Sequence, residues 1–357
     1  MRVVIFGATG NVGTSVVQRL ADDDTVTEIV GVARRLPRQW SPPKTTWVAA
    51  DMVTDDLDEV MRGADAVIHL AWSFHPTHRP RLTWRNNVLG TIRLLEAVAR
   101  ENVPVLVYAS SVGAYSPGPQ HRGVDESWPT HALPIAGYGR EKSYLERVLD
   151  TFERDNADIR VVRLRPGFIF KRSAAEAQRR IFAGPFLPNP LIRRELIPVV
   201  PDLPGLHLQA LHASDAAEAY RLALLHDVRG AFNIAADPVI DAASLAALLG
   251  ARVVSMPAWL PQSALRAAWR LHMVPATPGL FELALSLPLM DTTRATTELG
   301  WKPEISSLDA IAEVMRGIHD GAGGPTPPLD PQAGGRFRWR ELANGVGRRG
   351  GVTDDGR

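Results

Sequence analysis

The chain has 357 residues, of which 45% are hydrophobic and 22% charged, and its formal net charge at pH 7 is +1. This composition is ordinary for a globular protein with one large or two smaller domains, and the balanced charge favours neither a nucleic-acid nor a membrane partner. The absence of cysteine excludes disulfides, thiolate metal ligands and a cysteine nucleophile. No signal-like segment precedes the first predicted strand, so we expect a cytoplasmic protein.

The stretch from residue 2 to residue 20 has the pattern of a buried strand, a glycine turn and an amphipathic helix. An unbroken apolar run at 3–6 predicts a parallel strand that is buried on both faces. Gly7, Gly10 and Gly13 follow it. Glycines let the backbone approach a ligand phosphate, and the helix start favours a pyrophosphate. The spacing differs from GxGxxG, so a tight turn without a ligand is the alternative.

The second predicted strand, 28–33, ends beside two arginines. In a dinucleotide-binding fold an acidic residue at this place bonds the ribose of NAD, whereas an arginine accommodates the 2′-phosphate of NADP. Here Ala33 holds the place, and Arg34 and Arg35 come next. The sequence therefore favours NADP over NAD, with a solvated turn as the alternative reading of the two arginines.

Two more strands are predicted at 45–50 and 66–70. Asp51 follows the first, where it either accepts a hydrogen bond from an adenine amino group or caps a helix that begins near Asp55. Ala71 follows the second, at the strand end where open α/β sheets bind ligands. Without a carboxylate in register, we expect no metal site at the three nearby histidines, which are His69, His75 and His78.

A long amphipathic helix is predicted at 83–100 and a fifth strand at 104–109. A serine pair that ends at Ser111 follows this strand. Tyr138 and Lys142 follow at the start of another helix, and a spacing of four residues puts them on one face. A nearby ammonium favours the phenolate and would lower the pKa of the tyrosine. Such a trio can move a proton to or from an alcohol while a nicotinamide exchanges hydride with its carbon. An ordinary helix surface pair is the alternative.

The later chain adds strands at 161–164 and 231–235 and a final amphipathic helix at 308–318. Proline becomes more frequent between them. The apolar residues of 259–285 either line an apolar pocket or form ordinary core, and we favour core. From Gly321 to Arg357 the chain is rich in glycine, proline and charge, so we expect a mostly disordered tail. A solvated basic face is preferred to a diphosphate site for five arginines, namely Arg172, Arg179, Arg180, Arg193 and Arg194.

Several ordered motifs together resemble one family, the extended short-chain dehydrogenase/reductases of the NAD-dependent epimerase/dehydratase type. The resemblance covers residues 1–318. Its motifs are GATGNVG at 7–13, Asp51-Met52, HLAW at 69–72, NNVLGT at 86–91, YASSVGAY at 108–115, YGREK at 138–142, RLRPGFIF at 163–170, HASDAAEAY at 212–220, NIA at 233–235 and LGWKP at 299–303.

The resemblance implies an α/β fold, a doubly wound parallel Rossmann sheet with a small C-terminal substrate-binding lobe. The dinucleotide-binding domain would span 1–165, with returning segments near 205–236. The substrate-binding lobe would lie mainly in 166–320 and be discontinuous, and the tail would follow at 321–357. Family members are often homodimers, which here would pair helices 83–100 and 137–154.

The resemblance also implies roles for single residues. Tyr138 would be the acid/base, Lys142 would lower its pKa and hold the nicotinamide ribose, and Ser111 would polarise the reacting carbonyl. Asn86 competes with Asn87 for a supporting place. The residues expected to contact the cofactor are Gly7, Gly10, Asn11, Val12, Gly13, Arg34, Asp51, Met52, Ala71, Asn87, Tyr138, Lys142 and Pro166.

The function implied is that of an NAD(P)-dependent oxidoreductase or epimerase that transfers hydride at a secondary alcohol or ketone of a small-molecule substrate. Dehydration is disfavoured because Val112 stands where dehydratases of the family carry an acidic residue. The family's acidic residue after the second strand is also missing, in agreement with the preference for NADP. The alternative is a non-catalytic NAD(P)-binding redox sensor or scaffold.

Overall fold

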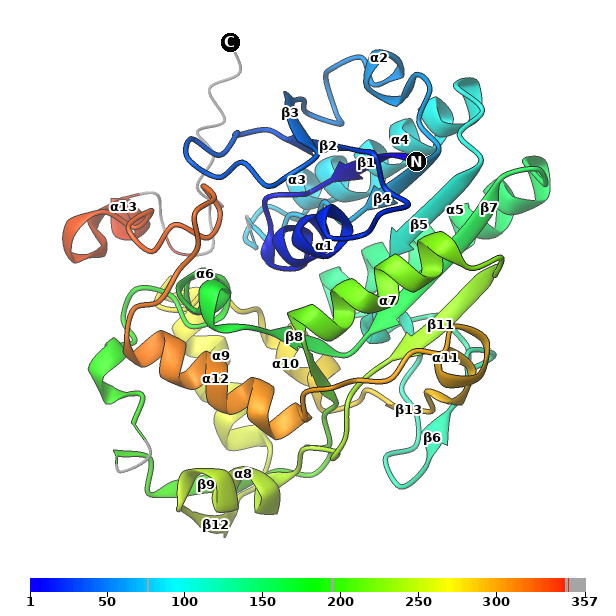
Figure 1. Cartoon of the computed structure of the whole chain (residues 1–357). Helices are drawn as coiled ribbons and strands as arrows, with labels where there is room; N and C mark the ends of the chain where they lie inside the picture. The colour runs from blue at the N-terminus through cyan, green and yellow to red at the C-terminus, as the bar shows by residue number, and fades with distance from the viewer. Residues whose placement is uncertain (76, 194–195, 344–345, 347–357) are drawn as a thin grey trace.

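A seven-stranded parallel sheet forms the centre of the computed structural model, which describes residues 1–75, 77–193, 196–343 and 346 (Figure 1). Its strand order is β3-β2-β1-β4-β5-β7-β11. The order reverses direction between β1 and β4, which is where open α/β sheets bind ligands. All seven predicted strands are confirmed, as β1 (Arg2–Phe6), β2 (Glu28–Ala33), β3 (Thr45–Ala49), β4 (Ala66–His69), β5 (Val105–Ala109), β7 (Arg160–Pro166) and β11 (Gly230–Ile234).

Helices cover both faces of the sheet, as its unbroken apolar strands require. Successive side chains of β1 point to opposite faces, so Val3 and Ile5 belong to one core cluster and Val4 and Phe6 to the other. The first cluster packs under α1 (Asn11–Ala21) and α7 (Ala213–Leu225), and the second under α4 (Gly90–Arg100) and α5 (Gly137–Asp155). The predicted doubly wound Rossmann-like fold is therefore confirmed.

Smaller elements gather at the carboxyl end of the sheet and form the remaining layer of the molecule (Figure 1). Three parallel strand pairs lie outside the main sheet: β8 (Phe168–Phe170) with β10 (Ala210–His212), β9 (Val199–Asp202) with β12 (Arg252–Ser255), and β6 (Gly123–Val124) with β13 (Leu289–Met290). The further helices are α2 (Asp58–Met61), α3 (Pro80–Trp84), α6 (Ala175–Phe182), α8 (Ala242–Leu249), α9 (Trp259–Arg270), α10 (Pro278–Ala284), α11 (Thr293–Glu298), α12 (Ser307–His319) and α13 (Trp339–Ala343).

Two predicted helices lie where they are expected, but their first residues differ from the prediction. The helix expected at 83–100 begins earlier, at Pro80, because α3 runs through a π-helical turn (Arg85–Leu89) into α4. The final helix expected at 308–318 is α12. Within the described ranges, no helix has both the length and the apolar character that crossing a bilayer requires.

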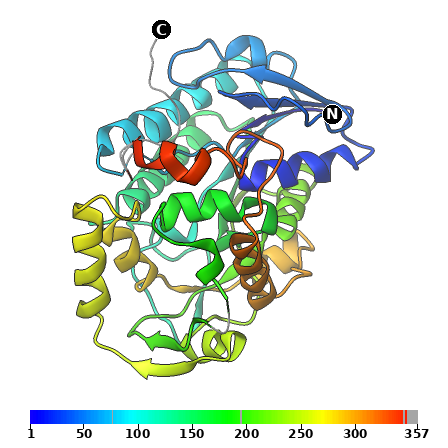
Figure 2. The same cartoon turned by 90° about the vertical axis from the view of Figure 1, so that its left-hand side faces the viewer.

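The expectation of a disordered tail from Gly321 is wrong for residues 321–343, which pack against the rest of the chain (Figure 2). Leu329 is 2% exposed and forms a small cluster with Ala174 and Ala177. The hydroxyl of Thr326 donates a hydrogen bond of 2.7 Å to the carbonyl oxygen of Thr9, in the glycine turn. Residues 344–345 and 347–357, which the same expectation covers, lie outside the described residues. Arg194, one of the five arginines expected on a basic face, also lies outside them.

Candidate active site

The glycine turn joins β1, α1 and the end of β4 so closely that two of its positions admit only glycine. Gly7 has φ +82°, and a Cβ atom there would lie 2.6 Å from the backbone nitrogen of Ala71. A Cβ on Gly13 would lie 2.2 Å from the carbonyl oxygen of Gly7. The turn therefore places the start of α1 directly beside Ala71, at the reversal point of the sheet.

The start of α1 has the features of an anion site. Its N-cap is Gly10, and no described side chain caps the helix. The side chain of Asn11 is turned toward β8, where it donates a hydrogen bond of 3.0 Å to the carbonyl oxygen of Ile169. The first N–H groups of the helix, at Asn11 and Val12, are thus left for a ligand, and the helix dipole favours negative charge there. This cradle fits the pyrophosphate of a dinucleotide.

Arg34 and Asp51 face each other at the ends of β2 and β3. The shortest distance between the guanidinium and the carboxylate is 3.9 Å, and both side chains are partly exposed. Asp51 accepts a hydrogen bond of 2.9 Å from the backbone nitrogen of Val53, while α2 begins only at Asp58. The alternative in which Asp51 caps that helix is therefore wrong. Met52 is half-buried beside it and packs against the second core cluster.

Ser111 and Tyr138 meet across Gly113. A Cβ atom on Gly113 would lie 2.8 Å from Cε1 of Tyr138 and 3.3 Å from the hydroxyl oxygen of Ser111. Ser111 follows β5, and its hydroxyl accepts a hydrogen bond of 3.0 Å from the nitrogen of Gly113. Tyr138 comes from the first turn of α5. The absent side chain of Gly113 thus lets the serine and the tyrosine share one site, a role that the sequence analysis missed.

Lys142 lies one helical turn after Tyr138 and is buried, with 4% of its surface exposed. Its ammonium donates a hydrogen bond of 2.6 Å to the carbonyl oxygen of Ala109, at the end of β5. It also lies 3.7 Å from the centre of the Trp72 ring, in a cation–π contact. Burial lowers the pKa of Lys142 to about 7, although the charges of Glu146 and Glu141 act in the opposite direction.

The pKa of Tyr138 is raised to about 12, chiefly because the phenol is buried. Hydrogen bonding with Ser111 acts in the opposite direction, and the charge of Glu141 raises the pKa further. The expected lowering by Lys142 is therefore not seen in this structure. The Trp72 ring contacts the Lys142 ammonium and meets the Tyr138 ring edge-on, at 5.6 Å between centres.

Asn87 is the more buried of the two neighbouring asparagines. It lies in the π-helical turn and is 2% exposed, whereas Asn86 is half-buried. The Asn87 amide accepts a hydrogen bond from the backbone nitrogen of Ser73 (2.7 Å) and donates to the Ser73 carbonyl oxygen (2.9 Å). It also donates to the carboxylate of Glu141 (2.7 Å), which accepts a second bond from Thr83. Asn87 therefore fixes the chain beside Trp72 to the helix that carries Tyr138.

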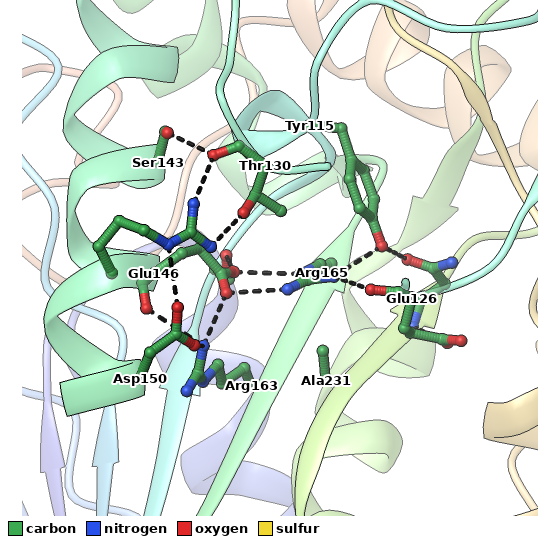
Figure 3. A network of polar contacts seen from close by, with 12 residues as sticks. Tyr115, Glu126, Thr130, Ser143, Glu146, Asp150, Arg163, Arg165 and Ala231 are labelled. Atoms are coloured by element: carbon green, nitrogen blue, oxygen red, sulfur yellow. Dashed lines mark hydrogen bonds and ion pairs between the residues drawn. The ribbon is translucent and has the colours of Figure 1, made fainter. Parts of the chain in front are cut away.

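A buried ionic network surrounds Glu146 of α5 (Figure 3). Glu146 is fully buried and pairs with Arg165 at 2.8 Å and with Arg163 at 3.0 Å. It also accepts a hydrogen bond from the hydroxyl of Ser110, the neighbour of Ser111. Arg165 donates a further bond of 2.9 Å to the phenol oxygen of Tyr115. These contacts anchor the end of β5 to α5 and β7.

The remaining candidates lie near the same end of the sheet. Pro166 is the buried last residue of β7 and pairs in register with Ile234 of β11. His69 is buried at the end of β4, 2.8 Å from the hydroxyl of Thr91, and burial lowers its pKa to about 3. In the part of the chain that the structure describes, no group of three histidine, cysteine or acidic residues is arranged to hold a metal ion.

Similarity to known proteins identifies the family of this chain. The model of the NAD dependent epimerase/dehydratase family matches residues 3–235. The chain belongs to this family. An uncharacterized protein of Mycobacterium tuberculosis is 26% identical over an alignment of 372 residues, which covers 98% of this chain and 90% of that protein.

The chain is also similar to two enzymes that act on different substrates. The decarboxylating sterol-4-alpha-carboxylate 3-dehydrogenase of Saccharomyces cerevisiae is 28% identical over 178 residues, 47% of this chain and 51% of that enzyme. The UDP-glucose 4-epimerase of Thermus thermophilus, solved in complex with NAD, has a TM-score of 0.65 and 21% identity. That match covers 89% of this chain and 99% of the epimerase, and at this identity it shows the shared fold.

Proposed function

We propose that this protein is an NAD(P)-dependent oxidoreductase or epimerase that acts on a secondary alcohol or ketone. The observation that carries the proposal is the meeting of Ser111 and Tyr138 across Gly113, with Lys142 one turn away. These groups lie at the carboxyl end of the sheet, as does the glycine turn whose open helix start fits a pyrophosphate. A bound nicotinamide dinucleotide would supply the acceptor or donor of hydride.

Each member of the trio has a distinct task in this proposal. As the phenolate, Tyr138 takes the hydroxyl proton of the alcohol, and as the phenol it gives a proton to the reduced ketone. Ser111 donates a hydrogen bond to the reacting oxygen and so stabilises the charge that develops there. Lys142 offers its positive charge next to the phenolate form of Tyr138, and Asn87 and Glu146 hold the surrounding backbone in place.

Replacement of Tyr138 tests this assignment. In Tyr138→Phe, turnover of a substrate that the wild type converts should fall by about two to four orders of magnitude, the usual contribution of a general acid/base. Affinity for the dinucleotide should stay unchanged, because the ring remains. Tyr144→Phe is the matched control, since Tyr144 lies on the same helix and is 44% exposed. Unchanged turnover in Tyr138→Phe would exclude the acid/base role and favour a non-catalytic NAD(P)-binding sensor or scaffold.

The proposed dinucleotide is NADP rather than NAD, because Arg34 follows β2 where an acidic residue would meet the ribose of NAD. Asp51, 3.9 Å away, also keeps that guanidinium near the adenosine side of the site. Arg34→Ala should weaken NADPH binding by at least about tenfold, the value of one charged phosphate contact. NADH binding, measured in the same titration, should change little. Equal losses for both forms would exclude the preference.

A further inference from the structure

The cavity beside Tyr138 has a mainly apolar wall. Its volume is about 80 Å³, and residues from four parts of the chain line it. The Phe74 ring stacks on the ring of Tyr138, with 5.5 Å between centres and 9° between planes, and meets Phe182 at 5.9 Å. The apolar members of the wall include Trp72, Phe74, Ile181, Phe182, Pro275 and Leu280.

The described residues of this wall include no cationic side chain. Among the described residues that line the cavity there is one carboxylate, Glu141, and neither a lysine nor an arginine. Both oxygens of Glu141 already accept hydrogen bonds, from Thr83 and from Asn87, and burial raises its pKa. A diphosphate is bound in proteins by cationic donors, above all by arginine. The wall offers a diphosphate no such partner.

Two arginines of α6, Arg179 and Arg180, come immediately before the lining residues Ile181 and Phe182. The C-terminal segment binds both. Glu341 accepts a hydrogen bond of 2.6 Å from Arg179, whose side chain is 1% exposed and also pairs with Glu176.

Arg180 is held in a similar way. It donates hydrogen bonds to the backbone oxygens of Pro328 (2.9 Å) and Asp330 (3.0 Å). A solvated basic face is therefore the wrong description of these two arginines, and so is a diphosphate site. Their donors serve to hold the C-terminal segment in place.

We infer that the site takes an apolar, uncharged secondary alcohol or ketone and not a nucleotide-diphosphate sugar. This inference rests on the proposed function. In the oxidation direction the carbinol C–H bond breaks and its electron pair leaves as hydride to the oxidised nicotinamide dinucleotide. The O–H proton passes to the phenolate of Tyr138, which becomes the phenol, and the C=O bond forms. An apolar substrate body would replace water along the cavity wall, with a gain of about 25 cal/mol for each Å² that is buried.

The test separates binding from turnover. Calorimetric titration of the full chain with NADP⁺ present would use cyclohexanone, menthone and androstenedione as apolar probes, and UDP-glucose and UDP-galactose as charged ones. Hydride transfer from NADPH and NADH to the same ketones would be followed by absorbance. We expect at least one apolar probe to bind and neither UDP-sugar to do so.

The two proposals fail in different ways. Binding of a UDP-sugar, or binding of no apolar probe, overturns the inferred substrate class. Hydride transfer or epimerisation with a UDP-sugar would do so while the proposed function stands. Conversely, an apolar ketone that binds without ever being reduced would count against the proposed function and leave the substrate class in place.

Variants of the wall locate the binding. Phe182→Arg should weaken the apolar probe by at least about tenfold, as expected when an apolar contact is lost. Phe186→Arg is the matched control, because Phe186 lies four residues later, is 53% exposed and does not line the cavity; its affinity should match that of the wild type. Leu280→Asn, at a lining residue of α10 rather than α6, keeps the test decisive if Phe182→Arg fails to fold. Wild-type affinity in both wall variants would overturn the inference.

Discussion

Gly113 is the residue on which the geometry of the proposed trio depends most directly. In Gly113→Ala the new methyl group would lie 2.8 Å from the ring of Tyr138, so the ring must move away from Ser111. We expect a loss of turnover of at least about tenfold and a loss of about 1–3 kcal/mol in the free energy of unfolding, the usual cost of overpacking. Steady-state kinetics and urea unfolding measure the two effects.

Gly137→Ala is the stability control for this substitution. A Cβ atom at Gly137 meets nothing closer than the guanidinium of Arg140, at 3.9 Å. It lies in the first turn of α5, where alanine is a better helix former than glycine. Its free energy of unfolding should equal or slightly exceed that of the wild type. Wild-type kinetics and stability in Gly113→Ala would show that the close approach does not position the tyrosine.

Lys142 makes the stability of the protein depend on pH. Burial lowers its pKa from 10.5 to about 7, so between these values the unfolded chain carries a proton that the folded protein has released. Stability therefore rises with pH in this window. From pH 7 to pH 9 the free energy of unfolding of the wild type should gain about 2 kcal/mol relative to that of Lys142→Met. Denaturant titrations at several pH values would reveal it, and parallel curves for the two proteins would contradict it.

At the scale of elements, the network around Glu146 joins α5, β5 and β7 (Figure 3). Burial by itself would raise the pKa of Glu146, but the hydrogen bonds and charge of Arg165, with the charge of Arg163, lower it to about 2. Glu146→Gln would leave two guanidinium groups buried without this carboxylate. We expect the free energy of unfolding to fall by about 3–5 kcal/mol.

An exposed ion pair on the same helix provides the control for that prediction. Arg154 and Asp155 pair at 2.9 Å, with 72% and 54% of their side chains exposed. Asp155→Asn should change the free energy of unfolding by no more than about 0.5 kcal/mol, because solvent screens such pairs. Urea unfolding of both variants measures the difference. If Glu146→Gln is no worse than Asp155→Asn, the network does not stabilise the fold.

The elements that the sequence predicted well are those whose evidence is local. Runs such as 3–6 are apolar at every position because both faces of a parallel strand are buried, and Tyr138 and Lys142 share a helical face through their spacing alone. Contacts between residues that are distant in the sequence have no local pattern that predicts them. Nothing near Glu146 shows that Arg163 and Arg165 will reach it from another strand, and nothing near Lys142 shows that the Trp72 ring will cover its ammonium.

At the scale of the whole molecule, the C-terminal segment shows how composition misleads. Glycine, proline and charge between residues 321 and 343 predict little burial, yet a few anchors suffice: Thr326 on the glycine turn, Leu329 among alanines and Glu341 on Arg179. Each of these residues contacts residues of another part of the chain. The segment connects the glycine turn with α6, so its order depends on the complete fold.

Leu329→Ala tests whether this segment contributes to the stability of the complete fold. Leu329 is 2% exposed, and truncation of a buried leucine costs about 2–5 kcal/mol because of the lost contacts and the cavity that remains. Leu342→Ala is the control, since Leu342 is 39% exposed; it should lose far less. We expect a single cooperative urea transition at a lower midpoint for Leu329→Ala and an unshifted one for the control. An unshifted midpoint in Leu329→Ala would mean that the segment is held without stabilising the fold, and an early separate transition would mean that it unfolds independently.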